Sequence, residues 1–309
     1  MISATKETFP LDQLLPYSDD KPEFHARTAR EQVSGKLDIN IGIVQKYLIK
    51  GIENSIGDCN EPKVVYNAWN LINYIIALPI ANVLVGEEAA SHEDLVKALG
   101  DLAFDLGPLL NDLLDYYMSR PNFDNTKPNN LHFHVDNLFS ISFAAINTTS
   151  RAAVDALYDM AGRPEVLNEL YEEALAFDKE CNGSVTLADV QNMVKLDSLV
   201  KESLRHAGNI INLSHHMVSK SYTFSNGFTI PEGRKISLYS DDMLKAKENF
   251  GDDAEEFKPF RFVNAKSPAT KVDRSYIVFG GGRHACPGRF FAINETKLFL
   301  HKDTDRVPV

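Results

Sequence analysis

The chain has 309 residues, 44% of them hydrophobic, and a formal net charge of −11. A chain of this length can bury a large core, so we expect a globular protein. The acidic balance argues against a nucleic-acid-binding protein, because a phosphate backbone is bound by clustered Lys and Arg. The three cysteines, Cys59, Cys181 and Cys286, are widely separated and odd in number, which indicates a reducing compartment without a disulfide framework.

The N-terminal part, residues 1–130, is predicted to be mostly helical and carries no chemical motif. Residues 1–22 form an irregular lead-in without the apolar run of a secretory signal. Apolar spacing predicts helices over 39–56 and 64–86. A short helix is expected over 23–34, and one or two helices, broken near Gly107-Pro108, over 92–118. The most apolar stretch, 71–85, is shorter than the ~20 residues that cross a bilayer, so we expect a buried core helix and no transmembrane anchor in this chain.

A connector rich in Pro and Asn, 120–130, precedes a long apolar helix predicted over 135–162. Small residues fill the middle of this helix, which is typical of a close helix contact. A further helix is expected from Pro164 to about Lys179. Thr186 is placed to cap the next helical region, which ends near Gly208.

Strands are predicted after that region. Residues 222–230 form a hairpin in which Asn226-Gly227 supplies the turn between aromatic and β-branched residues. A second turn at 231–233 leads into a strand at 235–238. The segment Pro259-Phe260-Arg261-Phe262 follows.

The stretch 279–289 reads Phe-Gly-Gly-Gly-Arg-His-Ala-Cys-Pro-Gly-Arg. Its glycines let the backbone turn tightly and approach a flat ligand. Cys286 precedes a helix predicted over 287–302, with Pro287 at its first position. Exposed N–H groups and the helix dipole at that end favour thiolate over thiol. A thiolate so held is a good axial ligand for iron.

The order of Phe279, Gly282, His284, Cys286 and Gly288 resembles the haem-binding loop of the haem-thiolate monooxygenases, the cytochrome P-450 superfamily. The resemblance implies that Cys286 binds the iron of haem b, iron protoporphyrin IX, and that Phe279, Gly282 and His284 line the cofactor site. Most members have arginine where His284 stands, and either side chain can donate a hydrogen bond to a haem propionate.

Residues 144–149, Ala-Ala-Ile-Asn-Thr-Thr, resemble the oxygen-activating segment of the same family. Thr148 aligns with the hydroxyl that relays protons there, and Asn147 replaces the usual carboxylate. Asparagine can hydrogen-bond but cannot relay a proton as an acid does. The resemblance therefore implies proton delivery through Thr148 and ordered water, beside a cavity lined by 206–217.

Glu202 and Arg205 lie three residues apart, on one face of their predicted helix. An exposed pair of this kind contributes only about 0.2–0.5 kcal/mol. In the P-450 superfamily the pair is buried and joined by the arginine of a Pro-x-Arg-Phe segment, here Arg261. The resemblance implies that the three residues form a structural lock beneath the haem.

The fold so implied is mainly α with a small β part, in a single domain spanning 1–309: a helical N-terminal part, 1–130, and a haem-binding core, 131–309. Full-length members begin with a membrane anchor, a proline-rich hinge, a first β region and several helices that the start of this chain does not resemble. The stretch 95–130 also looks short for the helices that roof the substrate cavity. We therefore expect an incomplete cytochrome P-450 fold, truncated at the N-terminus, of the fungal secondary-metabolism type.

The implied activity is monooxygenation of an apolar small molecule, with electrons from NADPH delivered by NADPH–cytochrome P-450 reductase. The expected location is the cytoplasmic side, peripheral at the endoplasmic reticulum. One alternative is a haem-binding remnant without oxygenase turnover, either a non-redox cyclase or isomerase or an inactive protein. Another is a zinc protein, disfavoured because no closely spaced ligand pair supports a closed site. Its ligands would come from His132, His134, His215, His216, His284 and Cys286.

Overall fold

The computed structural model describes residues 29–57, 64–101, 128–181, 185–207, 215–237, 239–265, 267–282 and 285–304. In chain order the elements are η1 Ala29–Val33, η2 Ser34–Lys36, α4 Leu37–Ser55, α5 Ala68–Val85, α6 Glu87–Ala90, α7 Glu93–Asp101, α9 Pro128–Ala161, α10 Pro164–Cys181, α11 Leu187–Asn192, α12 Val194–His206, β1 His215–Met217, β2 Tyr222–Thr223, β3 Thr229–Ile230, β4 Lys235–Ser237, α13 Ser240–Leu244, α14 Lys247–Phe250 and α15 Arg289–Thr304. The fold is mainly α with a small β part, as predicted.

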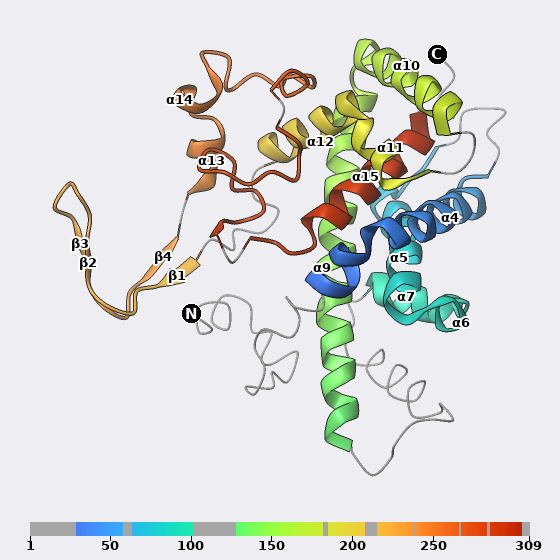
Figure 1. Ribbon diagram of the computed structural model, residues 1–309, viewed down its shortest axis with the longest axis horizontal. Helices are drawn as coiled ribbons and strands as arrows, with labels where there is room; N and C mark the ends of the chain where they lie inside the picture. The colour runs from blue at the N-terminus through green and yellow to red at the C-terminus, as the bar shows by residue number, and fades with distance from the viewer. Residues whose placement is uncertain are drawn as a thin grey trace.

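The long helix α9 runs through the middle of the molecule, and other helices pack against both sides of it (Figure 1). Its buried side chains recur every three or four residues, so one stripe of the helix faces the core. The stripe consists of Leu138, Ser142, Ile146, Thr149 and Ala153. Helix α9 begins at Pro128, inside the segment predicted as a connector, because proline suits a first helical position.

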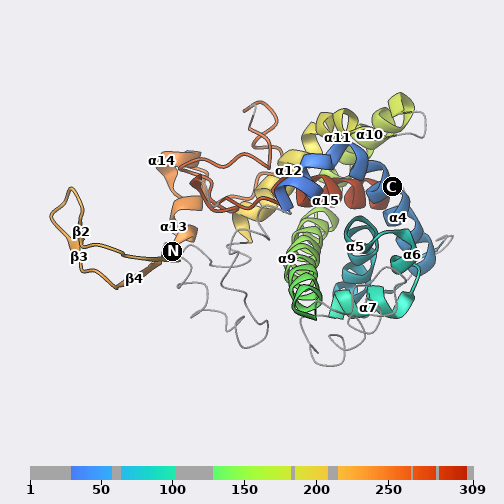
Figure 2. The same cartoon turned by 60° about the horizontal axis from the view of Figure 1, so that its bottom comes forward.

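Helix α5 is a core helix, as the apolar run at 71–85 predicts. The Asn67 side chain accepts a hydrogen bond from the Asn70 N–H at its start, and Gly86 ends it with a φ of 86°. Among the described residues it is the one helix long and apolar enough to suit a membrane span, yet 56% of it is buried inside the fold. It packs between α4 and α9 (Figure 2).

The helical region after α10 is divided into two helices. Thr186 and Asp189 form a capping box that starts α11, as the position of Thr186 predicts. The backbone then leaves the helical conformation at Met193, and α12 begins one residue later. The Glu173 carboxylate of α10 accepts hydrogen bonds from the N–H groups of Lys195 and Leu196. A carboxylate from another helix thus caps α12, an interaction that local spacing does not reveal.

The β part consists of two antiparallel pairs, β1 with β4 and β2 with β3. The β2–β3 hairpin forms where it was predicted, with Gly227 at a φ of 85°, and it projects from the body (Figure 2). Strand β4 pairs with β1 in a register that matches His216 with Ile236. The pairing of β1 was not predicted.

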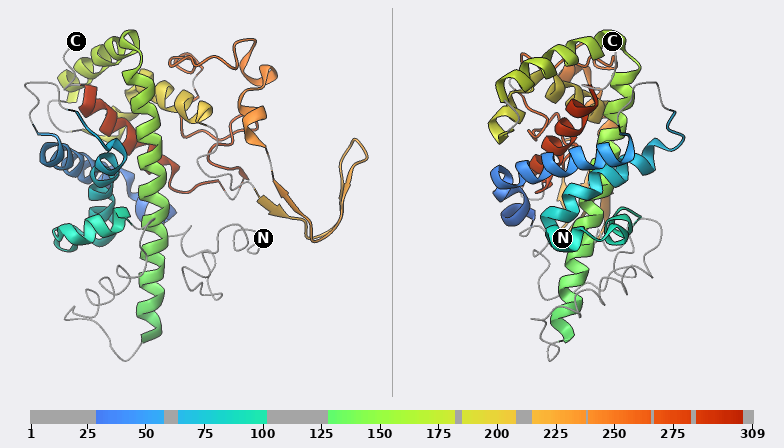
Figure 3. Two further views of the ribbon diagram at one scale, coloured as in Figure 1. Left: turned by 180° about the vertical axis from the view of Figure 1, so that it is seen from behind. Right: turned by 90° about the vertical axis from the view of Figure 1, so that its right-hand side faces the viewer.

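Helix α15 crosses α9 and also packs against α4 and α12 (Figure 3). Residues from the N-terminal part and from the haem-binding core predicted at 131–309 therefore share one hydrophobic core. This arrangement places the segment preceding α15, which contains Cys286, at the end of a buried helix.

Candidate haem-binding site

The loop before α15 is closed by hydrogen bonds between its own backbone groups. The N–H of Cys286 donates to the carbonyl of Phe279 at 2.7 Å, and the N–H of Gly280 donates to Ile277 at 2.7 Å. Gly280 and Gly282 have φ values of 75° and 60°, in the left-handed region that favours glycine. The glycines are thus what allows the chain to fold back and return Cys286 beside Phe279.

The Cys286 thiol forms no disulfide, and the residue is partly buried. Burial raises its pKa, while the N–H groups of Gly288 and Arg289 and the charge of Arg289 act in the opposite direction. The predicted preference for thiolate is therefore wrong for the chain by itself, because desolvation exceeds these contributions. The predicted helix start at Pro287 is also two residues early, since α15 begins at Arg289. A cation bonded to the sulfur reverses this balance, since a coordinated thiol is deprotonated.

The donor groups and the open space around the loop fit an iron porphyrin. Two backbone N–H groups lie at the sulfur, where they stabilise a coordinated thiolate. Side chains built at Gly281 or Gly282 would meet no atom within 4 Å, so the backbone there is open to a flat ligand. His284, predicted to bind a propionate, lies outside the described residues.

Asn147 and Thr148 lie together on α9, and both are bonded to their own helix. Thr148 Oγ1 donates to the Ala144 carbonyl at 2.6 Å, and Asn147 Nδ2 donates to the Phe143 carbonyl at 3.3 Å. The Asn147 Oδ1 is buried and has no partner among the described residues, so it can accept a hydrogen bond from water. Ala144, one turn before Thr148, is exposed. None of the described hydrogen bonds joins Cys286 to either side chain.

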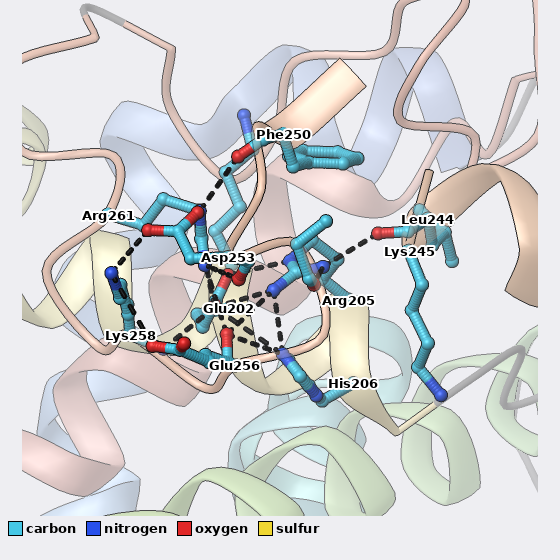
Figure 4. Close-up of polar contacts among 12 residues, drawn as sticks. Glu202, Arg205, His206, Leu244, Lys245, Phe250, Asp253, Glu256, Lys258 and Arg261 are labelled. Atoms are coloured by element: carbon cyan, nitrogen blue, oxygen red, sulfur yellow. Dashed lines mark hydrogen bonds and ion pairs between the residues drawn. The ribbon is translucent and has the colours of Figure 1, made fainter. Parts of the chain in front are cut away.

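Glu202, Arg205 and Arg261 meet in one buried ion cluster, here called the Glu202 cluster (Figure 4). Arg205 binds Glu202 with two hydrogen bonds, both 2.8 Å. Arg261 Nε donates to Glu202 Oε1 at 3.1 Å, and the Lys258 N–H donates to the same oxygen at 2.8 Å. The side chains of Glu202 and Arg205 are 0% exposed. This carboxylate has enough donors to stay ionised inside the fold.

The two arginines of the Glu202 cluster also hold the backbone of the segment 244–256. Five carbonyls accept hydrogen bonds of 2.6–3.2 Å from Arg205 or Arg261: those of Leu244, Phe250, Asp253, Ala254 and Glu256. The Asp253 carboxylate also accepts from Arg261 at 2.7 Å and pairs with Lys258. Sequence reasoning missed Asp253, because it lies within an acidic run where no spacing distinguishes it.

Electrostatics assign the Glu202 cluster a structural role. Burial by itself raises the pKa of Glu202, but hydrogen bonds from Arg205, His206 and the Lys258 N–H bring that pKa down to about 2. Hydrogen bonds from Arg261 and Lys258 lower the pKa of Asp253 to about 2 as well. Both carboxyls are too acidic to serve as general acids near neutral pH.

Lys201, the residue before Glu202, is buried, and no carboxylate among the described residues is hydrogen-bonded to it. Its Nζ donates to the carbonyl and hydroxyl of Ser267 at 2.9 and 2.6 Å, and it lies 4.4 and 4.7 Å from the ring centroids of Phe262 and Tyr276. Burial lowers its pKa to about 8, although Asp273 and Asp197 act in the opposite direction.

We expect Lys201→Met to flatten the pH dependence of stability above pH 8. The folded pKa of about 8 lies below the ordinary lysine pKa of 10.5, so between these two pH values Lys201 carries a proton in the unfolded chain but not in the folded one. The wild-type free energy of unfolding should therefore rise by about 3 kcal/mol more than that of the variant as pH increases from 8 to 10.5. Urea unfolding at both pH values measures the difference. Parallel curves for the two proteins would contradict the assigned charge.

Several predicted residues cannot be placed by side chain. Of the predicted cavity lining 206–217, residues 208–214 lie outside the described residues, and β1 is described by its backbone alone. The histidines of the zinc alternative fall in the same category: His284 is not described, and His132, His134, His215 and His216 have no described side chain. Within the described residues, no three His, Cys, Asp or Glu side chains gather as a metal site.

The family model for cytochrome P-450 matches residues 105–302, almost two thirds of the chain. The matched range includes α9, the Glu202 cluster and the cysteine loop. It covers the region in which every predicted site residue lies.

Curated relatives match parts of the chain. The cytochrome P-450 monooxygenase sirB of Leptosphaeria maculans is 33% identical over 181 residues, covering 55% of this chain and 34% of that protein. The monooxygenase braC of Annulohypoxylon truncatum is 31% identical over 248 residues, 72% of this chain and 48% of that protein. The monooxygenase paxQ of Penicillium paxilli is 34% identical over 166 residues, covering 51% of this chain and 32% of that protein.

The chain thus spans between a third and a half of the length of these relatives. All three are fungal proteins, in keeping with the fungal type predicted from the sequence. With the family model matching well over half of its residues, this chain belongs to the cytochrome P-450 family.

Proposed function

We propose that this chain binds haem b through the Cys286 sulfur and acts as a haem-thiolate monooxygenase on an apolar small molecule. The observation that carries the proposal is the closed glycine loop, which presents one free cysteine with two N–H donors at its sulfur. When bound, the haem supplies the oxygen activation and one-electron chemistry that protein side chains lack.

The chain's own residues have separate roles in this proposal. Cys286 holds the iron, Phe279 accepts the backbone hydrogen bond that fixes the cysteine, and Gly282 lets the loop turn. His284 is proposed to bind a propionate. The Glu202 cluster holds the backbone of the segment 244–256 in place.

Proton delivery is proposed to use Thr148 together with ordered water. The Thr148 hydroxyl has one hydrogen, which it donates to the Ala144 carbonyl, and lone pairs that can accept from water. To relay a proton it would turn this hydrogen from Ala144 toward a second neighbour while it accepts a proton from the water. The unpartnered Asn147 Oδ1 is an acceptor for the water that completes this path. Asn147 orients that water and does not itself act as an acid.

The redox partner proposed is NADPH–cytochrome P-450 reductase, with the protein on the cytoplasmic side and peripheral at the endoplasmic reticulum. The substrate is proposed to belong to fungal secondary metabolism, because the chain is similar to fungal cytochrome P-450 monooxygenases.

A carbon monoxide difference spectrum of the reduced, haem-loaded chain tests the proposal. We expect a Soret band at the position of thiolate ligation. A band at the position of histidine or thiol ligation, or no stable haem binding, would contradict it.

Turnover distinguishes the monooxygenase from a haem-binding remnant. With a fungal reductase, the monooxygenase consumes NADPH in step with product formation. A remnant gives the Soret band without coupled consumption.

A further inference from the structure

Arg289, the first residue of α15, connects two backbone segments through one guanidinium group. Its Nη1 donates to the Cys286 carbonyl at 2.8 Å, and its Nε donates to the Thr270 carbonyl at 3.0 Å. The guanidinium lies 4.1 Å from the ring centroid of Phe290. A planar group with fixed donors can hold two acceptors in a defined geometry, which the single ammonium of lysine cannot do.

The far end of this bridge is itself fixed, because each of the three residues before Thr270, 267 to 269, is bonded to helix α12. Lys201 of α12 donates to Ser267 and Pro268, and Asp197 of α12 accepts from the Ala269 N–H at 2.7 Å. Asp197 also pairs with Lys297 of α15 at 3.2 Å. Arg289 therefore ties Cys286 to a segment that is anchored to two buried helices.

Three successive backbone groups at Cys286 and Pro287 are therefore fixed by hydrogen bonds. The N–H of Cys286 is bonded to Phe279, its carbonyl to Arg289, and the next carbonyl, that of Pro287, accepts from Ser34 Oγ at 2.6 Å. Among these contacts the one to Arg289 alone brings a formal charge. Groups of this kind around a metal ligand set its orientation and the electron density that it donates.

We propose that Arg289 is a positioning residue for Cys286, which fixes the orientation of the cysteine and adds a positive charge that weakens electron donation from its sulfur to a bound iron. The inference rests on the proposed haem-thiolate function. It predicts that charge and bridging make separable contributions: the charge sets the reduction potential, and the bridge sets how long the thiolate bond persists.

Two variants separate these contributions in the haem-loaded chain. Arg289→Met removes the charge and both hydrogen bonds, so its reduction potential should shift to a more negative value, because a nearby positive charge favours the added electron. Arg289→Lys keeps the charge and loses the bridge, so its potential should stay close to that of wild type. Both variants should lose the thiolate Soret band of the reduced carbon monoxide complex about tenfold faster than wild type, because each loses at least one of the two charge-assisted hydrogen bonds that join Cys286 to Thr270.

Arg163→Met is the matched control. Arg163 also stacks on a phenylalanine, 4.2 Å from the Phe257 centroid, and donates to a carbonyl, that of Asp159, at 2.7 Å. It lies at the junction of α9 and α10, so its loss should leave both the potential and the Soret decay unchanged. If Arg289→Met does not fold, Arg289→Gln removes the charge while keeping one donor group, and its potential gives the same test.

Wild-type potential and decay in Arg289→Met or Arg289→Gln would overturn the inference, as would an equal shift in Arg163→Met. These results leave the proposed function intact. If wild type itself shows no thiolate Soret band, the proposed function fails and the role of Arg289 falls with it.

Discussion

Glu202→Ala is expected to destabilise the folded chain by about 3–5 kcal/mol, the cost of removing one partner from a buried ion pair. Arg205 has a fully buried side chain, and the variant leaves it without the carboxylate that now accepts two of its hydrogen bonds. A loss of this size is a large fraction of the 5–15 kcal/mol by which folded proteins are typically stable. Urea unfolding followed by circular dichroism measures it.

The matched control is Glu87→Ala. Glu87 pairs with Lys46 at the same 2.8 Å distance, but both side chains are well exposed. Its loss should cost far less stability than that of Glu202, because water and salt screen an exposed pair. Equal effects of the two substitutions would contradict the assignment of Glu202 to a buried structural cluster.

Acid unfolding gives a second measure of the same group. The folded pKa of about 2 lies below the ordinary glutamate pKa of 4.5, so the stabilisation from Glu202 is present above pH 4.5 and is lost as pH falls toward 2. The loss amounts to about 3 kcal/mol in wild type. Glu202→Gln cannot titrate, and its stability should change less over that range.

Cys286→Ala is expected to abolish the thiolate Soret band while leaving the polypeptide folded. The cysteine is held through its backbone N–H and carbonyl, bonded to Phe279 and Arg289, and alanine keeps both groups. Only the sulfur is lost, and with it the proposed iron ligand. Carbon monoxide difference spectra measure the first effect, and far-ultraviolet circular dichroism measures the second.

Cys181→Ala controls for the loss of a partly buried free thiol. Cys181 ends α10, and burial raises its pKa to about 11. This variant should keep the Soret band of the wild type. A Cys286→Ala protein that retains an unchanged Soret band would show that another residue binds the iron.

The sequence predicted correctly those elements that are determined by residues close together along the chain. The apolar run of α5, the capping box at Thr186 and the Asn-Gly turn of the β2–β3 hairpin each form where the sequence indicates. The spacing of Glu202 and Arg205 predicted only that the two side chains lie on the same face of a helix. It did not predict that the pair is buried. The connection of the pair to Arg261 came from the family resemblance.

Features that depend on distant residues could not be predicted in this way. The break at Met193 precedes a helix start capped by Glu173, some twenty residues earlier on another helix. The pKa of Cys286 was predicted in the wrong direction because a helix terminus is visible in sequence, whereas the burial that outweighs it is not. The hydrogen bond from Arg289 to the Thr270 carbonyl likewise could not be predicted, because Thr270 lies nineteen residues away along the chain.

Arg205 and Arg261 hold the segment 244–256 through its backbone carbonyls, and this affects which substitutions the segment can accept. Every residue type contributes a main-chain oxygen, so the side chain at each of the five positions is not itself needed for these hydrogen bonds. The backbone of this segment is held by the guanidinium groups of Arg205 and Arg261, which both lie outside it. Random mutagenesis should therefore find the exposed Glu256 permissive. Packing still restricts the fully buried side chains of Leu244 and Ala254, and the two arginines should tolerate almost no replacement.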